Sequence, residues 1–228
     1  MNGLPSDEVK RPSLRNTVSN RLRDAIINGE LKYGQRLNEV EIAQWLGVSR
    51  GLVREAMREL ETSGLIVNIP YRGTSVIGLT PELMQELYTL RTVLEEYAVD
   101  LAVQRITDAN IQELSAIVEK MRLSAQAGDG MGVVDADMQF HQTLYSFSRH
   151  ELLIEFLKRL SGQIQLFITA TKIVYSLFPT LTAVADSHEP ILEALRRRDP
   201  VLARRAVRDH ICEVGERLVS ILQRSHYE

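Results

Sequence analysis

Apolar residues recur at helical spacing in three stretches near the start of the chain. The first stretch begins at Leu14, and the others cover about residues 40–46 and 53–60. Within each stretch the apolar positions fall three or four residues apart, which is typical of a helix packed on one side. Residues that tolerate a left-handed conformation commonly end helices, and they follow the three stretches at Asn28-Gly29, Gly47 and Gly64. The pattern therefore predicts three consecutive helices.

A different pattern follows the third predicted helix. Two short runs rich in β-branched residues, 65–69 and 74–79, flank the sequence Pro70-Tyr71-Arg72-Gly73. Two such runs around a turn sequence predict a β-hairpin. Three helices and a hairpin in this order are the layout of a winged helix-turn-helix.

The remainder of the chain shows only helical periodicity. Thr80-Pro81 opens it with a capping hydroxyl followed by proline at the first helical position. We therefore predict a flexible arm over 1–13, a winged helix-turn-helix domain over 14–78 and an all-helical domain over 79–228. The predicted fold is mainly α. The second domain is expected to be a bundle of about six helices, at roughly 81–105, 108–127, 131–147, 151–176, 181–197 and 200–224.

Composition and charge narrow the possible functions. The chain has 44% hydrophobic and 25% charged residues and no apolar run long enough for a bilayer, so we expect no membrane insertion. Its polar start lacks the apolar stretch of a signal peptide, which favours a cytoplasmic protein. The net charge is −3, but residues 1–76 hold 11 Lys and Arg against 9 Asp and Glu, whereas residues 77–228 hold 16 against 21. This asymmetry is small, so the placement of the arginines matters more than their number.

Arginines spaced four residues apart lie on one face of the third predicted helix, at Arg50, Arg54 and Arg58. Ser49 can cap this helix, and its leading end exposes Gly51 and Leu52. A helix that enters the major groove needs this arrangement, because its first residues read base edges or contact phosphates. In the alternative interpretation the arginines form ion pairs on a solvated helix surface, with Glu55, Glu59 and Glu61.

Three segments of this region resemble the GntR family of bacterial regulators. They are GELKYGQRLNE over 29–39, LGVSRGLVREAMREL over 46–60 and GLI over 64–66. The resemblance implies that Arg50 and Arg54 contact operator bases or phosphates. It also implies that the hairpin tip, with Arg72 and Gly73, enters the minor groove of double-stranded operator DNA. The chain departs from the common family pattern at Tyr33 and at Gly51-Leu52.

One aspartate and three histidines fall on core-facing positions of the predicted second domain. Asp137 and His141 lie four residues apart on one helix, and His188 and His210 lie on two others. Burying an unpaired carboxylate is costly, and a divalent metal shared by these residues would remove the cost. Neutral imidazoles and a carboxylate suit Zn²⁺ or another first-row ion. The alternative is four unrelated polar residues, each hydrogen-bonded to the backbone.

These four residues also resemble a known ligand set. The segments DMQFH over 137–141, SHEPI over 187–191 and RDHI over 208–211 resemble the FCD effector domain of the FadR subfamily of GntR regulators, in its VanR-like branch. Metal-binding members of that family use an aspartate and three histidines in this order. The resemblance therefore implies a metal site, with zinc favoured and nickel or manganese as alternatives. Pro190 departs from the pattern because it limits the helix before it.

Arg91 is the other notable residue of the second domain. Leucines flank it on the inward side of its helix, and an inward guanidinium needs an anion. A carboxylate that binds it at two points fits best, which leaves an organic acid ligand or an internal ion pair with Glu95. In FCD domains an arginine in this helix commonly meets the carboxylate of the effector, so the resemblance favours a ligand-binding role.

Three functions are compatible with these features. The first is a transcription regulator, not an enzyme. It is expected to bind a palindromic operator as a homodimer, to respond to a small organic acid and to act as a repressor. The second is a metal-dependent enzyme that uses the Asp and His cluster to activate water. The third is a dimerisation platform with a structural metal. The sequence contains no glycine-rich phosphate-binding loop and no nucleophile motif that would support an enzyme, so the regulator is favoured.

Overall fold

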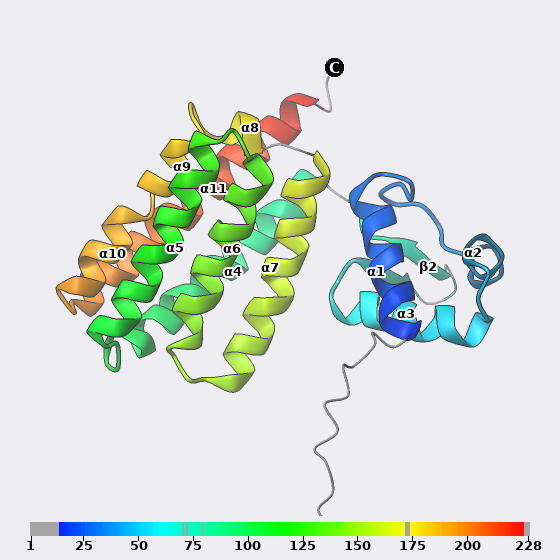
Figure 1. Ribbon diagram of the computed structural model, residues 1–228, viewed down its shortest axis with the longest axis horizontal. Coiled ribbons are helices and arrows are strands. Elements are labelled where there is room, and N and C mark those ends of the chain that lie inside the picture. The colour runs from blue at the N-terminus through cyan, green and yellow to red at the C-terminus, as the bar shows by residue number, and fades with distance from the viewer. Residues whose placement is uncertain (1–13, 70, 72, 79, 172–173, 226–228) are drawn as a thin grey trace, which may run out of the picture. The chain divides into compact units, whose positions relative to one another are not determined.

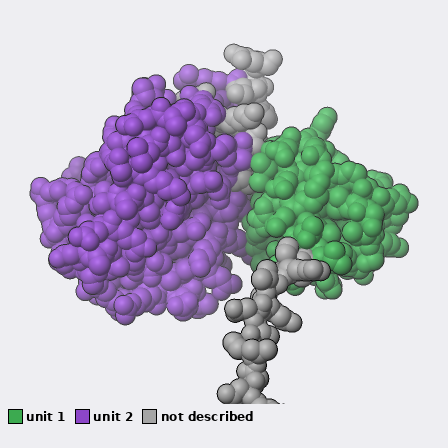
Figure 2. All heavy atoms as spheres, viewed as in Figure 1, with its two compact units in different colours: residues 1–77 green, residues 78–228 purple. Residues whose placement is uncertain are grey.

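The computed structural model describes residues 14–225 with the exception of 70, 72, 79, 172 and 173. The arm expected over residues 1–13 and the hairpin residue Arg72 lie outside the described residues. The chain forms two compact units, one ending at Ile77 and one beginning at Gly78 (Figure 2). Each unit buries its own set of apolar side chains.

The first unit contains the three helices and the hairpin that the sequence predicts (Figure 1). Its elements are α1 (Leu14–Ile27), α2 (Glu39–Leu46), α3 (Arg50–Thr62), β1 (Ile66–Ile69) and β2 (Gly73–Val76). The two strands are antiparallel, and Ile66 pairs with Val76 while Ile69 pairs with Gly73. Gly73 has a φ of 83°, a left-handed conformation that glycine adopts without strain. The predicted winged helix-turn-helix is confirmed.

Local signals define the turn between α2 and α3. The side chain of Asn38 accepts a hydrogen bond from the backbone N–H of Val40, and that of Ser49 accepts one from Leu52. Gly47 ends α2 with a φ of 65°. Because removing such an N-cap costs about 1 kcal/mol, Asn38 helps to fix where α2 begins and Ser49 where α3 begins. Behind the turn, α1 packs against α3 through buried side chains, which include Leu22, Ile26, Val53 and Leu60.

The second unit is a helical bundle (Figure 1). Its elements are α4 (Pro81–Val103), α5 (Asp108–Gln126), α6 (Gly130–Ser146), α7 (Glu151–Thr171), α8 (Val174–Leu177), α9 (Thr182–Asp186), α10 (Glu189–Arg196) and α11 (Pro200–Ser225). The long helix α4 packs along α11, and α5 packs against α6. Phe140 and Phe167 are fully buried between the helices. Among the described residues, no helix combines the length and the hydropathy needed to cross a membrane.

Within the described residues, one of the six predicted helical stretches is interrupted. The stretch 181–197 is divided into α9 and α10. In the stretch 151–176, α7 ends at Thr171 and α8 begins at Val174, and the two residues between them lie outside the described part of the chain. The break before α10 follows from Pro190, which lacks the N–H that would bond the carbonyl of Asp186 and which favours the first turn of a helix. His188 therefore lies at a helix boundary instead of inside a helix.

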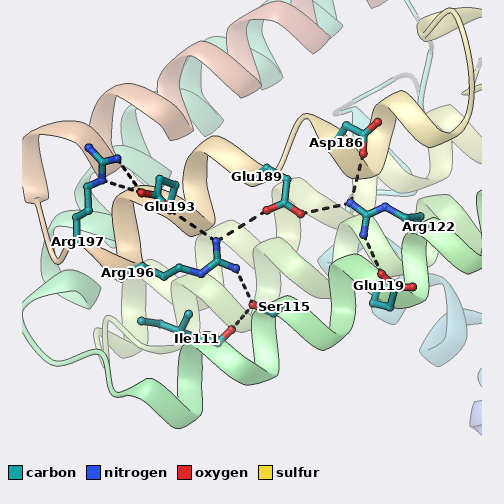
Figure 3. Close-up of polar contacts among 9 residues, drawn as sticks. All are labelled: Ile111, Ser115, Glu119, Arg122, Asp186, Glu189, Glu193, Arg196 and Arg197. Carbon is teal, nitrogen blue, oxygen red and sulfur yellow. Dashed lines mark hydrogen bonds and ion pairs between the residues drawn. The ribbon is translucent and has the colours of Figure 1, made fainter.

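Ion pairs hold the α9–α10 region against α5 (Figure 3). Arg122 on α5 contacts Glu119 of its own helix at 2.8 Å, and it reaches both Asp186 and Glu189 at 3.3 Å. Asp186 and Glu189 lie on either side of the turn that contains His188. Each pair is at least partly exposed and is worth only about 0–1 kcal/mol. Together they connect this turn to the neighbouring helix.

Candidate functional site

A set of metal-ligating side chains converges from three places in the second unit. Asp137 and His141 lie one turn apart on α6, His188 immediately precedes α10, and His210 lies on α11. The ligand atoms of the four residues all lie within 4.8 Å of one another. The three histidines are buried and Asp137 is partly exposed. The four residues selected from the sequence thus share one location.

The spacing of their ligand atoms suits a small cation. His141 Nε2 and His210 Nε2 are 3.2 Å apart, and His188 Nε2 and Asp137 Oδ1 are also 3.2 Å apart. Ligand atoms that lie about 2.0–2.1 Å from a tetrahedral zinc ion are separated by roughly 3.3 Å. These two pairs already have the spacing of ligands around one ion, and all four ligand atoms lie within 4.8 Å of one another.

Hydrogen bonds to the outer nitrogens orient two of the imidazoles. His141 Nδ1 lies 2.7 Å from Glu95 Oε2, and His188 Nδ1 lies 2.8 Å from the carbonyl oxygen of Val184. An ionised carboxylate and a carbonyl oxygen can only accept, so each Nδ1 carries a hydrogen and donates it. In the neutral imidazoles both Nε2 atoms then direct a lone pair into the site.

The contact between His188 and Asp137 needs a positive charge between its electron-rich atoms. Among the described residues, His188 Nε2 has no hydrogen-bond partner, although Asp137 Oδ1 is only 3.2 Å away. A proton on Nε2 would supply this charge for the one pair, whereas a metal ion would bind Asp137 and all three imidazoles. Three imidazole nitrogens and a carboxylate are a donor set that fits zinc or another first-row ion.

Burial and neighbouring charges favour the protonation states that metal ligands require. Burial, together with the charges of His188 and His141, holds the pKa of His210 well below its usual range. Burial also lowers the pKa of His141, although the Glu95 carboxylate opposes this effect. Burial would raise the pKa of Asp137, but its contacts with His188 and His141 lower it overall. Neutral imidazoles and an ionised carboxylate are the forms that bind metal.

Arg91 and Glu95 form a buried ion pair on α4 beside the four ligands. Arg91 Nε donates to Glu95 Oε1 at 2.6 Å, and the two side chains are 3% and 2% exposed. Burial would raise the pKa of Glu95, but the charges of Arg91 and His141 lower it to about 2. The internal ion pair considered for Arg91 is therefore present. It leaves Arg91 Nη2 buried and, among the described residues, without a hydrogen-bond partner.

A cavity of about 30 Å³ adjoins both the ligand set and the ion pair. Tyr88, Arg91, Asp137 and His210 are its polar lining, and apolar side chains that include Leu177 form the rest. Burial raises the pKa of Tyr88 to about 12, so its hydroxyl stays protonated and can donate. This volume accommodates about two water molecules, and a larger ligand needs the apolar walls to move.

The second role of Glu95 is not predicted by the sequence pattern. The pattern offers Glu95 only as a partner for Arg91, whereas in the structure it also bonds His141, 46 residues along the chain. The available signal was its position one helical turn after Arg91, on the buried side of α4. The carbonyl of Val184 gave no comparable signal, because every residue carries one.

The candidate DNA-reading residues lie at the start of α3. Ser49, Arg50 and Gly51 are exposed there, and Leu52 is half-buried. Arg54 pairs with Glu39 of α2, at 2.9 and 2.8 Å, and the arginine side chain is still 52% exposed. The partner of Arg54 is thus on the preceding helix, and it is none of the three glutamates considered on α3 itself.

The hairpin brings a further arginine near the candidate interface. A Cβ added to Gly73 would lie 3.3 Å from Arg36 Nη2, so the Arg36 guanidinium packs against the start of β2. Arg36 also forms an isolated backbone bridge with Ser75. Its contact with the hairpin depends on tertiary pairing, so the local sequence pattern did not indicate it. Arg36 is exposed and is a candidate phosphate contact.

Known families match both units of the chain. Residues 14–76 match the family of bacterial regulatory proteins named gntR, and residues 86–212 match the FCD domain. The chain is 31% identical over 209 residues to the probable D-xylose utilization operon transcriptional repressor of Paenarthrobacter nicotinovorans, with 90% of each chain covered. It is 27% identical over 216 residues to the gluconate operon transcriptional repressor of Bacillus subtilis, which covers 94% of this chain and 88% of that relative.

Solved structures share the fold. A GntR transcriptional regulator from Rhodococcus sp. RHA1 has a TM-score of 0.71 at 25% identity, covering 91% of this chain and 98% of the other. E. coli McbR/YncC has a TM-score of 0.68 at 24% identity, covering 94% and 99%. The chain therefore belongs to the GntR family of bacterial transcription regulators, and its helical unit is the FCD domain that is typical of the FadR subfamily.

Proposed function

We propose that this regulator is a homodimer that binds a palindromic operator and changes its operator affinity when a small organic acid binds beside a metal ion in the FCD domain. The observation that carries the proposal is the convergence of Asp137, His141, His188 and His210 next to the partly unsatisfied Arg91. Because its target is DNA, the protein acts in the cytoplasm.

The first unit supplies the DNA-reading surface in this proposal. The N-terminal end of α3 enters the major groove, where Arg50 and Arg54 contact bases or phosphates. Gly51 lets the backbone approach the DNA closely, and Ser49 and Leu52 complete the contact surface. In the wing, Arg72 and Gly73 are proposed to approach the minor groove, and Arg36 adds a positive charge beside Gly73.

A divalent metal bound by the four ligands supports the effector site. Zinc fits the three imidazoles and one carboxylate, and nickel and manganese are the alternatives. The ion would hold α6, α10 and α11 together at one point. It would also offer a coordination position to a carboxylate in the adjoining cavity.

The effector is proposed to be a small organic acid whose carboxylate meets Arg91. Arg91 Nη2 has no partner within the described part of the chain, and Tyr88 has a protonated hydroxyl in the same lining. Both groups are donors and suit an anion. The apolar remainder of the lining favours a compact acid with little further polarity.

A second copy of the chain is proposed to cover an apolar face formed by α4 and α7. These two helices pack together, and their outer face exposes Leu90, Val93, Tyr97, Leu152 and Phe156. Glu155 and Arg159 are exposed on the same side of α7 as this face. When such a surface packs against its own copy across a two-fold axis, positive groups of one copy can pair with negative groups of the other. Two recognition helices would then meet two half-sites of one operator.

The direction of regulation is proposed to be repression. Two relatives over nearly their whole length are named as operon repressors, one for D-xylose utilization and one for gluconate. Compact carboxylates with few further polar groups remain the chemical class that the Arg91 pocket suits.

The proposal is tested by identifying what the purified protein carries. The full chain is prepared without chelators, its metal content is measured by elemental analysis, and released small molecules are identified by mass spectrometry. We expect about one divalent ion per chain and a small organic acid that changes operator affinity when added back. Protein that takes up no Zn²⁺, Ni²⁺ or Mn²⁺ on reconstitution would exclude the metal site, and operator affinity insensitive to every recovered acid would exclude the effector role.

A further inference from the structure

We infer that Glu95 is a positioning residue for the metal site, because its carboxylate holds His141 in the orientation and tautomer that ligation requires. This inference rests on the metal site proposed above. Glu95 is on α4, whereas the four ligands lie on α6, at the start of α10 and on α11. The carboxylate therefore acts from outside the ligand set.

Both oxygens of Glu95 are engaged. Oε1 accepts from Arg91 Nε at 2.6 Å, and Oε2 accepts from His141 Nδ1 at 2.7 Å. The Glu95 and His141 side chains are 2% and 1% exposed, so solvent does not compete for these bonds. An ordinary ion pair between Arg91 and Glu95 would not require the second oxygen to point at an imidazole from another helix.

The bond from His141 has a direct consequence for ligation. With the hydrogen fixed on Nδ1, the lone pair is on Nε2, the atom that lies 3.2 Å from His210 Nε2. A negatively charged acceptor on the far side of the ring also makes that imidazole a stronger electron donor. Loss of such a partner usually lowers metal affinity by about 10- to 100-fold.

Arg91 takes part through Glu95. Its guanidinium stays charged and holds the carboxylate in place with a bond that is shielded from water. Arg91 thus bonds Glu95, and Glu95 bonds His141. These two hydrogen bonds connect the anion-binding side of the cavity to one metal ligand. His188 has a neutral acceptor in the corresponding position, the carbonyl of Val184. Of these two imidazoles, His141 is thus the one whose Nδ1 bonds a charged acceptor that Arg91 holds in place.

The affinity for Zn²⁺ tests this role. Full-length wild type, Glu95→Gln and Glu96→Gln are compared by competition with a chromogenic chelator. Glu96 is the matched control, because it is the next residue on α4 and its carboxylate pairs with Arg208 at 2.6 Å instead of with a ligand. We expect Zn²⁺ affinity to fall about 10- to 100-fold in Glu95→Gln and to stay within about threefold in Glu96→Gln. A Co²⁺ absorption spectrum should change only in the Glu95 variant.

Removal of the Glu95 charge leaves Arg91 buried without its partner, so folding needs its own control. The double variant Arg91→Met/Glu95→Gln removes both charges and should show the same loss of affinity. A folded single or double variant with wild-type Zn²⁺ affinity would overturn the inference while leaving the metal site intact. Wild type that binds no Zn²⁺ would instead reject the proposed site itself.

The tautomer of His141 can be measured in the unaltered protein. Nitrogen-15 NMR of the imidazoles should show His141 with its hydrogen on Nδ1, protected from exchange with water, both with and without Zn²⁺. Ligation through Nδ1, or a hydrogen on Nε2 in the metal-free protein, would overturn the inference. This measurement does not depend on any variant folding.

Discussion

Arg54 on α3 makes a two-point ion pair with Glu39, the first residue of α2, through Nε and Nη2 at 2.9 and 2.8 Å. The hydrogen bond from Arg54 holds the pKa of Glu39 below its usual value. The pair therefore fixes the direction of the guanidinium before DNA arrives. A guanidinium has five N–H donors, so Arg54 keeps others for a base or phosphate.

Replacement of Arg50 or Arg54 by Ala should weaken operator binding by about 1–3 kcal/mol each, because each variant loses a contact to a base or phosphate. Fluorescence anisotropy with labelled operator measures the affinity at fixed salt. Arg205→Ala is the matched control, since Arg205 is a 76% exposed arginine on α11. Unchanged affinity in both single variants would show that α3 is not the recognition helix.

His141→Ala or His210→Ala should lose the bound metal and lower the melting temperature of the loaded protein. Metal that binds only the native state adds its binding free energy to stability. Elemental analysis and thermal unfolding measure the two effects. His150→Ala is the control, because His150 lies outside the ligand set and packs edge-on against Tyr97. Equal metal content in all three variants would contradict the assignment.

Arg91→Ala should keep operator binding and lose most of the response to the organic acid. Arg91 lies in the FCD domain, and the coupling between effector and operator is expected to be about 1–3 kcal/mol, or roughly 5- to 150-fold in affinity. Operator binding is followed while candidate acids are titrated at saturating Zn²⁺. Arg208→Ala, which removes an exposed arginine of the same domain, should respond as wild type does. A normal response in Arg91→Ala would leave Arg91 with only its ion-pair role.

Val93→Glu combined with Phe156→Glu should convert the proposed dimer to monomers and weaken operator binding. Both side chains belong to the α4–α7 face and are more than half exposed, at 65% and 62%. Buried acidic groups at an apolar interface are strongly unfavourable. Sedimentation velocity at micromolar concentration measures the oligomeric state of each variant. Val201→Glu, at a 62% exposed position on α11, should remain dimeric, and a dimeric double variant would place the interface elsewhere.

Metal-free protein should lose stability as the pH falls below about 6.5. Burial, with the charges of His188 and His141, depresses the pKa of His210 in the folded state, so the unfolded chain takes up a proton first. The free energy of unfolding is highest when the pH is above the pKa that His210 has in the unfolded chain. It falls as the pH decreases toward the pKa of His210 in the folded protein, by up to about 1.4 kcal/mol per pH unit for such a group. Thermal unfolding with EDTA from about pH 8 to 5 measures the slope. His210→Gln should have a shallower slope, and equal slopes would contradict the explanation.

Features that depend on residues a few positions apart could be predicted from the sequence. Ser49 caps α3 and Thr80 caps α4 because a hydroxyl bonds the N–H three residues later. The hairpin formed between the two β-branched runs, with Gly73 in a left-handed conformation. Helical spacing also assigned Asp137 and His141 to one face of α6.

The pairing of residues from different elements was decided by the tertiary structure. Arg54 bonds Glu39 and not a glutamate of its own helix, and Glu95 joins Arg91 to His141, because helix packing brings these groups within reach. Helix propensity and hydrophobic periodicity depend on residues that are close in the sequence, so they do not predict contacts between distant residues. The sequence by itself thus determined the hairpin, the four candidate ligands and the helices, apart from the break between α9 and α10. Packing alone decided which buried charges meet, since a buried charge needs a partner wherever the fold supplies one.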